Sequence, residues 1–122
     1  MAIEIINQQP VTLQASAAQT GNNTSSQGTP QALLEGVSPM RGVVAYVIVT
    51  AVSGTTPSMT VTLQDSPDGT NFASTGAATA AITGIGVYRI AAQNLGAFIQ
   101  ASSAITGTTP SFTYSIVVVG TQ

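Results

Sequence analysis

The sequence predicts an all-β fold, an antiparallel β-sandwich or jelly-roll-like single domain with an extended N-terminal segment. β-Branched residues and alternating apolar and polar residues recur along most of the chain, as in strands that bury one face. Turn residues separate about eight short candidate strands, a spacing typical of sandwiches and jelly rolls. The chain has 122 residues and a mass of 12.2 kDa, which suits one domain.

Residues 1–15 are expected to form the extended N-terminal segment, in which apolar and polar residues alternate except at Asn7–Pro10. Two interpretations of this segment are open. It is either an arm that adds a strand to the sheet of a neighbouring protein, or the first strand of its own sandwich. In the first case we expect its contacts to be Ile3, Ile5, Val11 and Leu13.

A polar loop is expected at residues 16–31, which contain no large apolar residue. Residues 31–35 allow one helical turn at most, because Pro30 and Gly36 bracket them. The β-sandwich domain is then expected to span residues 32–122.

The strands of this domain differ in how much of their surface they bury. Gly42–Val52 is a nearly continuous apolar run, typical of a strand buried on both faces. Residues 58–64 and 111–119 alternate instead, which predicts one buried face each. Those faces carry Met59, Val61 and Leu63 in the first strand, and Phe112, Tyr114, Ile116 and Val118 in the second. Shorter strands are expected at residues 71–74, 77–83, 87–91 and 95–102.

An internal repeat links Ala51–Thr60 with Ala104–Thr113, at an offset of 53 residues and with seven of ten residues identical. Each copy joins an apolar segment to an alternating one through Gly-Thr-Thr-Pro. This pattern predicts a β-hairpin with a loop of about four residues in each copy. The functional alternative is a pair of equivalent binding loops on one rim.

Composition excludes several kinds of chemistry. The chain has no Cys and no His, and its two cations are both arginines, so it has no Lys. These absences exclude zinc sites of the usual kind, Cys nucleophiles, Ser-His-Asp triads and Walker A loops. We therefore predict no enzyme activity, no catalytic residues and no cofactor.

Charge and hydropathy limit the partners. A net charge of −2 and a pI near 4.3 leave no basic patch for phosphates, so we expect no binding to nucleic acid. The strongest apolar run is about half the roughly 20 residues of a membrane-spanning helix, so no membrane partner is expected. The start of the chain lacks the basic region of a signal peptide, which predicts synthesis in a cytoplasm without export.

Carboxylates cluster only at Asp65-Ser-Pro-Asp-Gly-Thr-Asn71. The segment resembles a calcium loop in part, but it lacks the distal Glu and the full ligand spacing. A turn fits better, with Pro67 in its second position and Gly69 in its fourth. In that turn Asp65 is expected to accept backbone N–H groups, and no metal site is predicted.

The two cations, Arg41 and Arg89, each stand among apolar neighbours. Either their stems lie along the sheet with the charged heads in solvent, or they anchor a protein interface. We weigh these equally, and Arg41 is the interface candidate. Tyr46, Tyr88 and Tyr114 are scattered in the sequence and do not indicate a sugar-stacking platform.

Only 5% of the residues are charged, against roughly 25% in ordinary soluble domains. Without Lys, the exposed edges of the sheets lack the usual protection against pairing with other strands. The chain is therefore expected to associate with copies of itself or with a larger structure.

Three segments carry a family resemblance: Val61–Phe72, Ala97–Ala101 and Ile105–Thr113. They contain a Gln-Asp-Ser-x-Asp-Gly-x-Asn-Phe turn, an intervening strand pair and a Thr-Gly-x-x-Pro hairpin. Residues 43–119 as a whole resemble small β-rich structural proteins encoded among the head genes of tailed bacteriophages.

The resemblance implies a virion protein on the capsid surface, most simply a decoration (cement) protein that binds outside the shell of the major capsid protein. Such proteins are often homotrimers seated where capsomers meet. Two alternatives remain open: a head-fibre or tail-tip module that binds a sugar or receptor, and a tail-tube or baseplate component.

Overall fold

The structure, a computed structural model, describes residues 10–24 and 42–121. Within these ranges the chain forms six strands and no helix. The strands are β1 (Val11–Gln19), β2 (Asn23–Thr24), β3 (Gly42–Ser66), β4 (Ala73–Ala78), β5 (Gly86–Gln93) and β6 (Phe98–Thr121). All their pairings are antiparallel, which confirms the predicted all-β, antiparallel single domain.

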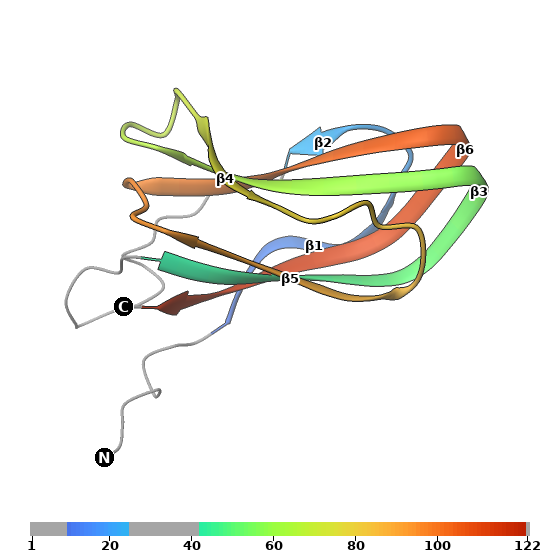
Figure 1. Cartoon of the computed structure of the whole chain (residues 1–122), viewed down its shortest axis with the longest axis horizontal. Coiled ribbons are helices and arrows are strands. Elements are labelled where there is room, and N and C mark those ends of the chain that lie inside the picture. The colour runs from blue at the N-terminus through green and yellow to red at the C-terminus, as the bar shows by residue number, and fades with distance from the viewer. Residues whose placement is uncertain (1–9, 25–41, 122) are drawn as a thin grey trace, which may run out of the picture.

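Two long strands, β3 and β6, organise the fold. They have 25 and 24 residues. They pair along their whole length, from Gly42 opposite Thr121 at one end to Ser66 opposite Phe98 at the other. Both strands bend near the middle, at the right-hand end of Figure 1, so that the two-stranded ribbon folds back on itself. The halves of this folded ribbon lie in two facing layers.

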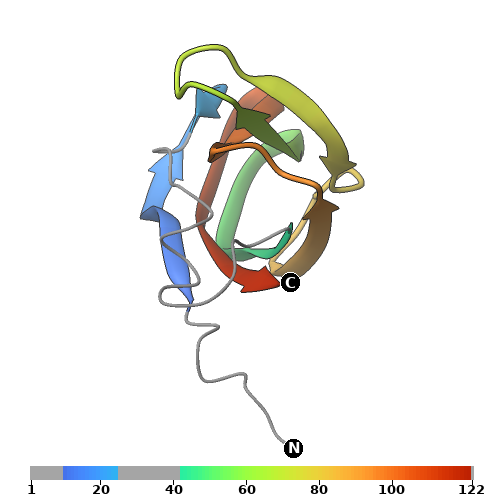
Figure 2. The same ribbon diagram turned by 90° about the vertical axis from the view of Figure 1, so that its left-hand side faces the viewer.

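The shorter strands complete the two layers. Layer A consists of β1, the C-terminal half of β6, the N-terminal half of β3 and β5. Layer B consists of β2, the N-terminal half of β6, the C-terminal half of β3 and β4. A further bridge joins Met59 to Ile82, where the chain passes from β4 toward β5. Seen from the end, the strands surround a central core (Figure 2).

The core is formed by the inward-facing residues of both layers. The alternating faces predicted for residues 58–64 and 111–119 are confirmed, because their apolar members are all buried. The largest fully buried side chains are Tyr114, Phe112, Met59, Leu63, Ile82, Ile99 and Ile116. The Tyr114 hydroxyl donates a buried hydrogen bond of 2.8 Å to Ser103 Oγ, which connects layer A to layer B.

The internal repeat does not form two hairpins, and that prediction is wrong. Each copy is instead the bend of one continuous long strand, and the two copies pair with each other. Val52 pairs with Phe112, and Met59 pairs with Ile105, which is the same pair after the 53-residue offset. The two bends are therefore related by a local two-fold arrangement, with the Thr55–Thr108 pair at its centre.

The same backbone geometry recurs in both bends. Gly54 and Gly107 have φ values of +109° and +127°, and Thr56 and Thr109 both have φ of +46°. Each of these threonines donates a 2.7 Å hydrogen bond to the carbonyl oxygen of the residue before it. The Gly-Thr-Thr sequence thus encodes a bend that carries each long strand from one layer into the other. In a hairpin the two halves of the strand would pair with each other, whereas here each half pairs with the other long strand.

The apolar run at residues 42–52 is buried on one face only, so the prediction of two buried faces is wrong. Val43, Ala45, Val47 and Val49 point into the core. The residues between them are half-buried. In a two-layer sandwich each sheet has one inner face, so a run that is apolar throughout leaves apolar side chains outside.

The predicted division of the N-terminal region also changes. The boundary expected at residue 15 lies inside β1, and β1 and β2 belong to the sandwich together with the later strands. The helical turn considered at residues 31–35 lies outside the described residues.

Candidate interaction surface

The predicted interface residues fall into two groups. Ile3, Ile5 and Arg41 lie outside the described residues. Val11 is half-buried and pairs with Val118, while Leu13 is 3% exposed in the core of its own chain. For residues 11–15 the structure therefore shows the first strand of the chain's own sandwich, and Leu13 is not available to a neighbour.

Polar side chains form hydrogen bonds at the connection between β1 and β2. Gln14 Oε1 accepts a 2.7 Å hydrogen bond from Asn23 Nδ2. Asn22 Oδ1 accepts a 3.0 Å hydrogen bond from the backbone N–H of Ile105 in β6. Part of the segment predicted as a polar loop thus has a structural role at the edge of the sandwich.

The acidic turn is organised by Asp68, and not by Asp65 as expected. Asp68 Oδ1 accepts the backbone N–H groups of Thr70 and Asn71, both at 2.9 Å, and Oδ2 accepts Asn71 Nδ2 at 2.8 Å. Asp65 Oδ2 instead accepts the backbone N–H of Gly96 at 2.8 Å, on the connection to β6. The carboxylates are thus used to shape loops, as the turn interpretation predicts.

These hydrogen bonds change the acidity of Asp68. The N–H groups of Asn71 and Thr70, followed by the side chains of Asn71 and Ser66, hold the pKa of this carboxyl well below its usual range. The described residues contain no group of three acidic side chains placed to hold a metal ion.

The three tyrosines lie in different environments. Tyr114 is in the core, and the hydroxyl of Tyr88 donates a 2.8 Å hydrogen bond to the carbonyl oxygen of Gly84. Tyr46 lies on the outer side of layer A, where its cross-strand neighbours are Arg89 of β5 and Val117 of β6. They do not form one aromatic surface.

The outer side of layer A is mainly apolar, and we call it face A. Residues that pair directly across strands point to the same side of a sheet, so the register defines its members. They are Val44, Tyr46 and Ile48 from β3, Val87, Arg89 and Ala91 from β5, and Ser115, Val117 and Val119 from β6.

The outer side of layer B is polar, and we call it face B. Its central members are Thr60, Thr62 and Gln64 from β3, with Gln100, Ser102 and Ala104 from β6. Gln100 Nε2 donates a 2.8 Å hydrogen bond to Gln64 Oε1 across the strands. The sequence showed apolar residues in 42–52, but it gave no signal that they and β5 share an outer surface.

No protein-family model matches the chain, and no curated protein sequence matches it. No helix among the described residues is long and apolar enough to cross a membrane. A search of solved structures finds a likeness to the crystal structure of the SPBc2 prophage-derived protein YomS. The match covers 99% of each chain with a TM-score of 0.54 and 12% sequence identity. This likeness shows that the same fold occurs in a prophage-derived protein.

Proposed function

We propose that this chain is a virion structural protein of a tailed bacteriophage, a capsid decoration protein that binds the outside of the shell of the major capsid protein. The observation that carries the proposal is the contrast between its two outer surfaces, because an apolar sheet face on a sparsely charged chain is suited to burial against another protein. The prophage origin of a protein with the same fold supports the phage context.

Such a protein acts by binding and needs no catalytic group. A molecule that binds the assembled shell better than free subunits stabilises the shell through linkage. At a free concentration of 100 times the Kd, the stabilisation is about 2.7 kcal/mol for each occupied site. On this proposal the chain sits on the capsid surface as a homotrimer and contacts neither nucleic acid nor membrane.

The test uses empty shells of the major capsid protein that were assembled without this chain. Purified protein is added, and its cosedimentation with the shells and the melting temperature of the shells are measured. We expect saturable binding and a higher melting temperature. Absence of binding would reject the proposal, and a stacked hexameric ring in the free protein would favour a tail component instead.

A further inference from the structure

We propose that face A is the surface that docks on the shell, and that it receives an apolar segment of the major capsid protein whose carboxylate pairs with Arg89. This inference rests on the proposed function and adds to it the surface and the chemistry of the contact.

The apolar part of face A is continuous across three strands. In register, Ile48 lies between Val87 and Ser115, Tyr46 lies between Arg89 and Val117, and Val44 lies between Ala91 and Val119. Val87 is 64% exposed, and Ile85, just before β5, is 69% exposed. These are the large apolar residues most open to solvent in the described part of the chain.

The two outer faces of the folded ribbon provide an internal comparison. Val117 in layer A and Gln64 in layer B are 53 residues apart, and both belong to an outer face. Their partners across the ribbon are Tyr46 and Gln100. Face A thus carries an outward-facing Tyr–Val pair, whereas face B carries an outward-facing, hydrogen-bonded Gln–Gln pair. The register shifts near the bends offset the pairing by one residue, so only Val117 and Gln64 correspond to each other.

An outward-facing pair of this ribbon therefore does not require apolar side chains. Face B shows that a polar pair satisfies the same strand pairing. The apolar residues of face A consequently point to an occupant that removes them from water.

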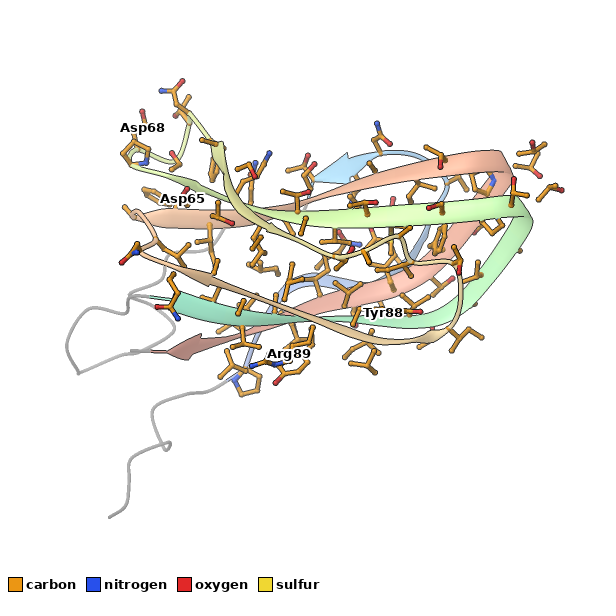
Figure 3. The ribbon with its side chains drawn as sticks, viewed as in Figure 1. Asp65, Asp68, Tyr88 and Arg89 are labelled. Carbon is orange, nitrogen blue, oxygen red and sulfur yellow. The ribbon has the colours of Figure 1, made fainter. Side chains whose placement is uncertain are left out.

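Arg89 specifies the charge of that occupant. It is exposed on β5 beside the apolar residues, and no ion pair joins it to a carboxylate in the described ranges. The described acids, Asp65 and Asp68, lie at the opposite side of the molecule and accept hydrogen bonds in and near the acidic turn (Figure 3). An arginine at the margin of an apolar contact favours a carboxylate on the partner.

A second copy of the chain fits this surface less well. A second copy of face A offers another Arg89 and no carboxylate to pair with it. The strand spacing and rise give face A a projected area on the order of 400 Å². Stable two-component interfaces bury about 800 Å² from each partner. A contact of this size is effective where it is repeated across a lattice.

The experiment compares variants of face A with matched variants of face B in the shell-binding assay. Val87→Asp and Arg89→Glu change exposed positions on β5, an edge strand of layer A. Ala78→Asp and Ser74→Glu each add a carboxylate at an exposed position of β4, an edge strand of layer B. Thermal unfolding and the mass of each free variant are measured in parallel.

We expect Val87→Asp and Arg89→Glu each to weaken shell binding at least tenfold, and the two layer-B variants to change it less than twofold. If the wild type does not bind shells, the proposed function fails. If the wild type binds and all four variants bind equally well, the function stands and the role of face A is overturned.

Two other outcomes also overturn the docking proposal. If the face A variants change the mass of the free protein while shell affinity is retained, a second copy covers the face. If both variants unfold at lower temperature than the layer-B variants, and the folded fraction keeps its affinity, the face is covered within the chain. If Val87→Asp alone does not fold, the shell affinities of Arg89→Glu and Arg89→Gln test the docking proposal in its place.

Discussion

At the scale of single residues, the bends of β3 and β6 depend on Gly54 and Gly107. A Cβ added to Gly54 would lie 2.6 Å from the carbonyl oxygen of Thr109, and one added to Gly107 would lie 2.9 Å from that of Thr56. Both glycines also have φ values in the left-handed region. Close backbone approach and φ therefore exclude side chains at both positions.

We predict that Gly54→Ala and Gly107→Ala each lower the free energy of unfolding by about 2 kcal/mol or more. Gly84→Ala is the matched control, because nothing lies within 4 Å of the Cβ it would add. That control is expected to stay within about 0.5 kcal/mol of the wild type. Urea unfolding measures all three, and equal stability of Gly54→Ala and Gly84→Ala would contradict the assignment of the bend.

Asp68 makes the stability of the acidic turn depend on pH. Its pKa in the folded protein is lowered by the N–H groups that it accepts, so its charged form stabilises the fold above the unfolded-state pKa of about 3.9. This contribution is lost as the pH falls from there toward the lower pKa of the folded state.

We therefore expect Asp68→Asn to be less stable than the wild type near neutral pH. The difference should shrink below about pH 4, because the wild-type carboxyl then begins to take up its proton. Urea midpoints of both proteins, measured across this range, provide the comparison. A difference that stays constant down to low pH would show that the charge of Asp68 does not stabilise the turn.

At the scale of elements, β1 shows how an edge strand is tied to the core. Its pairing with β6 shifts register on both sides of Gln14, and both Leu13 and Gln14 are buried. The irregular pairing is typical of an edge strand that is protected from pairing with other chains. β1 is therefore part of the folding unit.

We predict that Leu13→Ala lowers the free energy of unfolding by about 2–4 kcal/mol, since it leaves a cavity in the core. Val11→Ala is the control. Because Val11 is only half-buried, its truncation should lower the free energy of unfolding clearly less. Thermal or urea unfolding distinguishes them. If Leu13→Ala were as stable as Val11→Ala, β1 would not be anchored in the core as the structure shows.

At the scale of the whole molecule, the two layers are parts of one folded two-stranded ribbon. Both β3 and β6 run through layer A and layer B, and the buried Tyr114–Ser103 hydrogen bond connects the layers. Neither layer contains a complete long strand of its own. The two layers therefore share one core and one set of backbone pairings.

We expect the protein to unfold in a single cooperative transition, with equal calorimetric and van't Hoff enthalpies. Amides in the layer A and layer B halves of β3 should exchange hydrogen with similar protection. Two separated transitions, or protection confined to one half, would contradict the shared core.

Local patterns were sufficient for much of this fold. Alternation in residues 58–64 and 111–119 identified the buried faces correctly, because a strand with one face in the core has a period of two residues. Pro67 and Gly69 likewise marked the turn after β3, since turn geometry depends on neighbouring residues.

What the sequence alone determined is thus the all-β class, the buried faces of residues 58–64 and 111–119, and the acidic turn, all of which follow from local patterns. The number and bounds of the strands differ from the prediction: residues 71–74 and 77–83 do not form two strands, and the strand expected at 95–102 is the start of β6. Only the tertiary structure decided that the two Gly-Thr-Thr-Pro segments bend and pair with each other, that β1 closes its own core, and that residues 42–52 expose one apolar face. These features depend on contacts between residues that are tens of positions apart in the chain. No local period in a sequence specifies which distant strand will cover which face.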